Sequence, residues 1–160
     1  MSNEGRALYG MCYAGLGTSS SLGGLIGWNS STQEAIVLDS VAIGGGAGVE
    51  AKESYIVLSR DLDAGGLGFG SGFRLPPVLE GNDAGGSVDK YQMELWERRV
   101  PLNGAEIAPS ESFNLIVGVV PVTGAGDSSE WLEVRYHIGS RRYASYPGIG
   151  AEFLGPDECD

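Results

Sequence analysis

The sequence predicts a single all-β domain over residues 1–160, built as a two-sheet antiparallel sandwich with one long glycine-rich loop. The 160-residue chain contains 27 glycines, which suit tight turns but weaken a helix by about 1 kcal/mol each relative to alanine. Short apolar or alternating segments recur between turns that contain glycine or proline, as in all-β domains. No segment shows sustained helical periodicity.

The clearest predicted element is a β-hairpin near the C-terminus. In residues 131–138, apolar side chains at every second position alternate with charged or polar ones, which is the pattern of a half-buried strand. A Gly-Ser pair then forms a two-residue turn, and residues 141–146 return along the first strand. This register places Tyr136 opposite Tyr143 on one face of the hairpin.

The core of the predicted sandwich is a strand at 113–120. Its residues are apolar on both faces and many are β-branched, which is typical of a central strand that is covered on both sides. A short strand that turns at Pro109 precedes it, so residues 107–146 hold the core strand and the closing hairpin. Two more strands are predicted at 35–43 and 49–59, and broken alternation in the first of them indicates a bulge.

The N-terminal stretch 7–33 carries no charged residue. A turn at 17–21 interrupts its apolar run well short of the ~20 residues that a membrane-spanning helix needs, and no basic segment precedes it. We therefore predict two short buried strands here and no insertion of this chain into a membrane. Residues 88–99 fit both a strand and one face of a helix, and we favour the strand.

Residues 60–89 are rich in glycine and aperiodic, so we predict a long loop. Loops of this length inside a compact domain are usually functional, which makes this loop a candidate binding surface. Asp61 and Asp63 stand at alternating positions before a glycine, as in a calcium loop, but a third ligand and a closing glutamate do not follow. We interpret the pair as a solvated acidic turn and expect no cofactor, with a calcium site as the alternative.

Charge and motifs narrow the function further. Ten basic and 21 acidic residues give a net charge of −11, which argues against nucleic acid as a partner. The one histidine, His137, lies on the polar face of the predicted hairpin, opposite Arg142, and no serine elbow or phosphate-binding loop is present. We predict a non-enzymatic binding or structural module; the alternative is a cation-dependent carbohydrate-binding or hydrolytic protein that uses the acidic loop.

One combination of basic and aromatic residues marks a candidate binding surface, namely Arg98, Arg141 and Arg142 with Tyr136 and Tyr143. Arginine and tyrosine side chains stack on sugars, peptides and the aromatic groups of a partner. The other interpretation is that the charges protect an edge hairpin from aggregation.

Cys12 and Cys159 lie near opposite ends of the chain. A disulfide between them would close nearly the whole chain, would stabilise it by about 4 to 5 kcal/mol and would require an oxidising compartment. The alternative is a buried free Cys12 with an incidental Cys159 in an exposed tail. The residues leave both alternatives open.

An Asn-Ser loop precedes a strand in 28–41, a proline turn in 100–109 precedes the core strand at 114–119, and a tyrosine-rich hairpin follows at 134–143. Together these stretches resemble immunoglobulin-like ectodomains of surface proteins of Gram-positive bacteria. The resemblance implies an immunoglobulin-like sandwich and no catalytic residue. We expect an extracytoplasmic or cell-surface module, with the cytoplasm as the alternative, that binds a protein partner or a second copy of itself.

Overall fold

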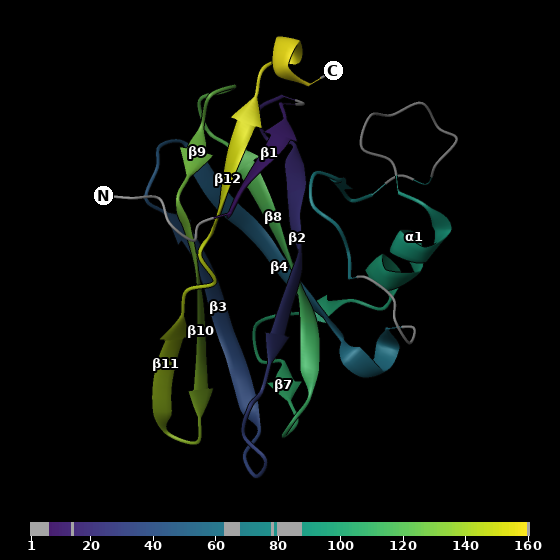
Figure 1. Cartoon of the computed structure of the whole chain (residues 1–160), viewed down its shortest axis with the longest axis vertical. Helices are drawn as coiled ribbons and strands as arrows, with labels where there is room; N and C mark the ends of the chain where they lie inside the picture. The colour runs from purple at the N-terminus through teal and green to yellow at the C-terminus, as the bar shows by residue number, and fades with distance from the viewer. Residues whose placement is uncertain (1–6, 14, 63–67, 78, 80–87, 160) are drawn as a thin grey trace.

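The computed structural model describes residues 7–13, 15–62, 68–77, 79 and 88–159, and Figure 1 shows their arrangement. The elements in chain order are β1 (Ala7–Cys12), β2 (Ser19–Trp28), β3 (Ile36–Gly44), β4 (Val49–Leu58), η1 (Ser59–Asp61), β5 (Arg74–Leu75), α1 (Lys90–Glu97), β6 (Val100–Pro101), β7 (Glu106–Ile107), β8 (Ser112–Pro121), β9 (Ser128–Ser129), β10 (Trp131–Ile138), β11 (Arg141–Ser145), β12 (Ile149–Leu154) and η2 (Pro156–Glu158). Strands therefore dominate, and the prediction of an all-β fold is confirmed.

The strands of the described residues form three hydrogen-bonded sheets rather than the predicted two. Their orders are β5-β2-β8-β4-β6, β11-β10-β3-β7 and β1-β12-β9. The third sheet arises because the chain bends after β11 at Pro147, which has no N–H, and Gly148, which has a φ of 71°. After this bend the chain no longer runs along the β10–β11 hairpin. The next strand, β12, pairs with β9 and β1.

The sequence also predicts purely antiparallel sheets, and this prediction is wrong for one pair of strands. β1 runs parallel to β12, with Ala7 beside Ile149 and Cys12 beside Leu154. Parallel strands need a long connection between them, and nearly the whole chain separates these two. Local sequence patterns do not identify such a distant partner.

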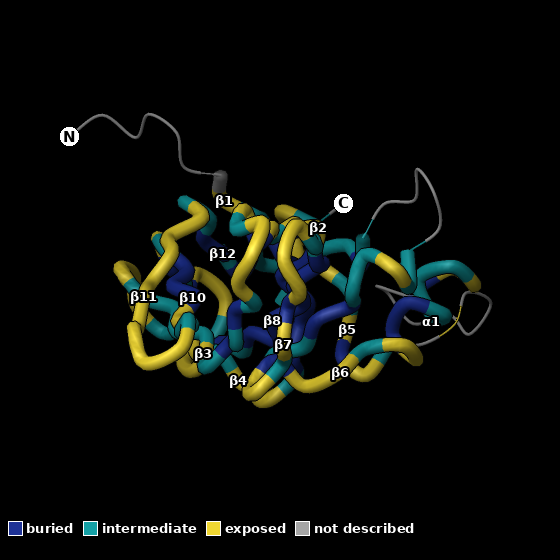
Figure 2. Tube along the Cα trace, turned by 90° about the horizontal axis from the view of Figure 1, so that it is seen from below, coloured by how far each residue is buried: buried dark blue, intermediate teal, exposed yellow. Residues whose placement is uncertain are grey.

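The main core lies between the five-stranded sheet and the other two sheets. Figure 2 shows these buried segments at the centre of the molecule and the exposed hairpin strand β11 at one side. The core draws buried side chains from all three sheets, among them Met11, Leu22, Leu38, Leu115, Leu132 and Phe153. These residues hold the layers together through apolar contact.

The five-stranded sheet is also covered on its second face, by α1 and residues 68–77 (Figure 1). Val57 of β4 and Ile116 of β8 pack there against Phe69, Leu95 and Trp96. Burial of β8 on both faces confirms the predicted central strand.

Residues 88–99 contain helix α1, so the predicted strand is wrong. Asp89 caps the helix, because its carboxylate accepts a hydrogen bond from the N–H of Gln92 at 2.8 Å. Leu95 and Trp96 are adjacent in sequence and both buried. A half-buried strand would turn one of them to solvent, whereas the helix packs both against the sheet.

The predicted hairpin and bulge are confirmed. β10 pairs with β11, and Tyr136 lies opposite Tyr143. β10 also pairs with β3, where the register shifts so that Asp39 has no direct partner between Leu38 and Ser40. This irregularity accounts for the broken alternation in the first of the two middle strands.

The described residues of the glycine-rich segment 60–89 include regular secondary structure, although the sequence predicts a loop. It contains the end of η1 and the short strand β5, and the Phe69 side chain is fully buried. The N–H of Gly70 donates to the side-chain oxygen of Gln92 on α1 at 2.8 Å. Residues 68–77 therefore belong to the packing of the fold.

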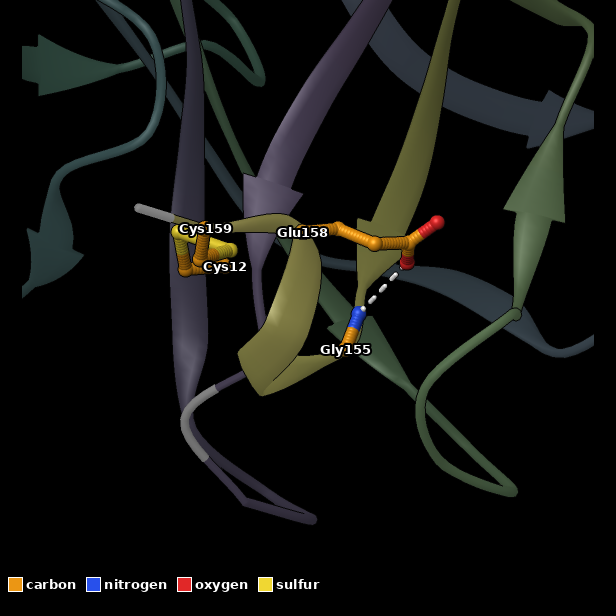
Figure 3. The surroundings of a disulfide bond; sticks show 4 residues. All are labelled: Cys12, Gly155, Glu158 and Cys159. Carbon is orange, nitrogen blue, oxygen red and sulfur yellow. Dashed lines mark hydrogen bonds between the residues drawn. A yellow bond between two sulfur atoms is a disulfide. The ribbon is translucent and has the colours of Figure 1, made fainter.

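A disulfide joins Cys12 at the end of β1 to Cys159 after η2, so the structure has the first of the two alternatives for these cysteines (Figure 3). The parallel strands β1 and β12 end side by side, and η2 then turns the chain back toward Cys12. The carboxylate of Glu158 accepts a hydrogen bond from the N–H of Gly155 at 3.0 Å and closes this turn.

Within the described parts of the chain, no helix is both long enough and apolar enough to cross a membrane.

The loop before β9 is organised by the buried carboxylate of Asp127. This carboxylate accepts hydrogen bonds from the hydroxyl and the N–H of Thr123 and from the N–H of Gly124. The hydrogen bond from the Thr123 hydroxyl is the main reason that the pKa of Asp127 lies below its ordinary 3.8, although burial opposes this shift.

We expect Asp127 to contribute to acid sensitivity. Its folded pKa is lowered, so its stabilising effect is complete above the unfolded pKa of 3.8 and is lost as the pH falls through the folded pKa. Asp127→Asn should be less stable than the parent at neutral pH and should show a shallower loss of stability below pH 3.8. Denaturant titrations across this range measure both effects, with the exposed Asp157→Asn as control. Parallel acid limbs for parent and Asp127→Asn would contradict the assignment.

Candidate binding groove

A groove of about 240 Å³ opens between β2 and the β10–β11 hairpin, at the side of the sandwich where two sheets end. We call it the edge groove. Its floor is made by apolar side chains of β3 and β8, namely Ile36, Leu38, Phe113 and Leu115. Its walls are residues 25–31 on one side and Val134, Tyr136, Ile138, Ser145 and Pro147 on the other. None of the described residues that line it is charged, so the groove suits apolar groups.

The wall formed by β2 is an open strand edge. Near its start, Ser21 exchanges backbone hydrogen bonds with Gly72 and Phe73, each 2.7 Å long. A bulge at residues 23–24 follows. Beyond it, β2 is paired with β8 on one edge, and the part of the chain that the structure describes places no strand on the other.

Two large apolar side chains on this strand are exposed. Ile26 is 60% exposed and Trp28 is 66% exposed. Gly27 lies between them, and a Cβ at this position would overlap the ring of Phe113. A single exposed apolar residue is ordinary, but two on an open strand beside an apolar groove are typical of an interaction site.

The hairpin wall contains part of the predicted basic and aromatic set. Tyr136 lines the groove, and the ring of Tyr143 stacks on it with centroids 5.4 Å apart. Arg141 lies opposite Ile138, another lining residue. Arg142 lies opposite His137 and is exposed. The structure thus brings four of the predicted residues to one hairpin, the two tyrosines and the two arginines.

The remaining predicted residues lie elsewhere. Arg98 follows α1, and its guanidinium donates to the backbone carbonyl of Asp61 in η1 at 2.8 Å. In Figure 1, α1 is on the opposite side of the five-stranded sheet from β11. Arg98 therefore does not join the hairpin arginines, and Asp63 lies outside the described residues.

Two titratable groups of β10, His137 and Glu133, contact other titratable side chains. The Nδ1 atom of His137 is 2.7 Å from the Oδ1 atom of Asp39. The buried carboxylate of Glu133 accepts hydrogen bonds from the hydroxyl of Tyr146 and from Arg135. The Tyr146 hydrogen bond, with Arg135, lowers the pKa of Glu133, and the same bond raises the pKa of Tyr146. None of these groups lines the edge groove.

The sequence did not single out Ile26 or Trp28, because the uncharged stretch 7–33 predicts buried strands. That prediction is wrong for these two side chains, which are exposed. The available signal is the glycine content around them: Gly23, Gly24 and Gly27 leave this strand few side chains with which to cover its neighbours. Whether the side chains of Ile26 and Trp28 are exposed depends on which parts of the chain pack beside β2, and the sequence pattern does not predict this.

Comparison of the chain with protein-family models, with curated proteins and with solved structures found no match in any of the three. Among the residues that the structure describes, no group of three or more His, Cys, Asp or Glu side chains is arranged to hold a metal ion.

Proposed function

We propose that this protein is a non-enzymatic binding module with an immunoglobulin-like sandwich fold, and that it binds a protein partner through the edge groove. The observation that carries this proposal is the uncharged groove beside an open strand edge, with Ile26 and Trp28 exposed on that strand. Protein interfaces are depleted of charge at their centre and enriched in aromatic residues. His137 and Glu133 of the hairpin contact other titratable side chains and do not line the groove, which favours binding over acid–base chemistry.

The strand order supports the immunoglobulin-like assignment. In that fold, one layer holds the second, fifth and fourth strands, and the other holds the third, sixth and seventh. The longer strands of this chain follow the same order, with β2-β8-β4 in one layer and β3-β10-β11 in the other. The segment with α1 is then an insertion between the fourth and fifth strands.

The disulfide supports an extracytoplasmic location, because such bonds persist mainly in oxidising compartments. A thiol titration of the denatured protein, isolated from its own cells with alkylating agent present, tests this part of the proposal. We expect no free thiol. Two free thiols would argue for a reducing compartment.

Trp28→Ala is expected to reduce partner binding at least about tenfold, since truncating an interface tryptophan typically costs 2 kcal/mol or more. Its stability should stay within about 0.5 kcal/mol of the parent, because the side chain is 66% exposed. A photo-reactive residue at position 26 should form a discrete protein adduct in the producing cells, and this adduct should fade with Trp28→Ala. The control is Leu16→Ala, which removes an exposed apolar side chain outside the groove lining.

The rival to binding is catalysis. Turnover of a substrate in a broad hydrolase screen, abolished by His137→Ala, would contradict the proposal. An adduct at position 26 that persists unchanged with Trp28→Ala would contradict the assignment of the groove.

A further inference from the structure

We propose that the edge groove binds an extended segment of another protein chain, which adds to the open edge of β2 as a new strand. This inference rests on the proposed binding function and specifies the partner and the way it binds. Strand addition uses backbone hydrogen bonds for affinity and alternate side chains for specificity. The structure offers both kinds of contact at this edge.

The backbone of β2 presents hydrogen-bonding groups to the groove side. Along a strand, successive residues direct their N–H and C=O groups to opposite edges. The N–H of Asn29 donates to the carbonyl of Glu111 at 2.9 Å, on the β8 side of the strand. Trp28 and Ile26 therefore direct their backbone groups to the open edge. These are the groups with which an added strand would pair.

The arrangement of the sheets explains why this edge is open. In immunoglobulin sandwiches with the strand order seen here, the first strand lies beside the second. In this protein β1 pairs with β12 of another sheet instead. Past the bulge at residues 23–24, the outer edge of β2 has no strand from the described chain beside it. A segment from a partner would therefore take the position beside β2 that the first strand takes in immunoglobulin sandwiches.

The groove selects apolar side chains at alternate positions. An added strand places every second side chain on the same face. One such set would enter the groove and contact Leu38, Leu115 and Tyr136. With a volume of about 240 Å³, the groove takes the side chains of a short segment and not a folded domain.

A partner chain fits this site better than the six residues before β1 or a second copy of the chain. The stretch before β1 reads Met-Ser-Asn-Glu-Gly-Arg and has one apolar residue, so it lacks the alternating pattern. A second copy is disfavoured because each copy carries a net charge of −11. Composition and charge thus favour an extended segment of a different protein over residues 1–6 and over a second copy.

The positive charges of the hairpin indicate that the partner segment carries an acidic residue next to its apolar side chains. The β10–β11 hairpin carries three of the ten basic residues of the chain; Arg135 contacts Glu133, whereas Arg141 and Arg142 are exposed. Arg141 lies opposite the groove-lining Ile138, next to the hairpin turn. A partner segment with Asp or Glu next to its apolar run complements this end of the groove.

A synthetic peptide tests the inference directly. The probe is acetyl-Asp-Val-Thr-Val-Thr-Val-amide, titrated into the intact protein by calorimetry. Two matched controls carry N-methyl groups, one on the valines and one on the threonines. Because alternate residues face the same edge, one control should lose binding by about tenfold or more and the other should bind like the probe.

Variants of the protein provide the reciprocal test. Ile26→Pro removes a donor from the open edge and leaves the β8 side of the strand paired, so it should weaken peptide binding about tenfold. Ile26→Val should bind like the parent. With Arg141→Glu, a probe that begins with Lys should bind better than the probe that begins with Asp. Thermal unfolding checks that each variant is folded. If Ile26→Pro does not fold, the two N-methylated peptides still test the inference with the parent protein.

Equal binding of both N-methyl peptides would overturn strand addition, as would no binding of the probe at about 1 mM. If the probe fails while a Trp28-dependent adduct still forms at position 26, this inference is wrong and the binding function stands. If both fail, the proposed function is wrong as well.

Discussion

Replacing Cys12 and Cys159 by serine should lower the free energy of unfolding by about 4 to 5 kcal/mol, the largest loss that we expect for this chain. The bond joins residues 147 positions apart, so it removes conformational freedom from almost the entire unfolded chain. Such a loss is comparable to the total stability of many domains. The folded state should change little, because Cys12 is exposed and Cys159 is half-buried.

Urea titrations of the parent, the two single variants and the double variant measure this effect. Both single variants should match the double variant, since either one removes the bond. The reduced parent should match them too, which separates the crosslink from the substitutions themselves. A difference below about 1 kcal/mol between oxidised and reduced parent would show that the bond contributes little to the fold.

Sequence patterns correctly predicted those strands in which the burial of each residue follows from its position along the strand. The β10 strand of the hairpin was predictable because Leu132, Val134, Tyr136 and Ile138 pack on the core and alternate with charged or polar residues. β8 was predictable because both of its faces are covered, which produces a continuous apolar run. In these segments the environment of each residue follows directly from its place in the strand.

The errors have physical reasons as well. The sequence signal of α1 was its cap, Asp89 followed by Gln92 three residues later, and not its apolar pattern. The third sheet depends on the bend at residues 147–148 and on a partner strand at the other end of the chain. Such long-range pairing leaves no periodic trace in either strand.

The candidate site was predictable in part. Tyr136 and Tyr143 could be placed together because the hairpin register is local. Arg98 was grouped with them by residue type, although the fold places it beside Asp61. The exposure of Trp28 depends on which parts of the chain pack over β2, and the uncharged pattern of 7–33 does not identify them.

The second large loss of stability is expected in the glycine-rich segment, because residues 68–77 pack against the five-stranded sheet. Phe69 is fully buried there and contacts the rings of Phe73 and Trp96, with centroids 5.5 and 5.8 Å away. Its N–H donates to the side-chain oxygen of Asn114 on β8 at 2.8 Å. The backbone and the ring therefore connect this segment to β8 and to α1.

Phe69→Ala should destabilise the protein by about 3 to 5 kcal/mol, because it removes a buried ring and leaves a cavity between the sheet and α1. Leu79→Ala is the matched control: this apolar side chain of the same segment is 43% exposed, and its loss should cost within about 0.5 kcal/mol. Hydrogen exchange should quicken first in α1, whose Trp96 loses the contact, while the β10–β11 hairpin stays protected until global unfolding. Equal losses for the two variants would mean that the ring of Phe69 is not part of the core, and the segment would then return to being a candidate binding loop.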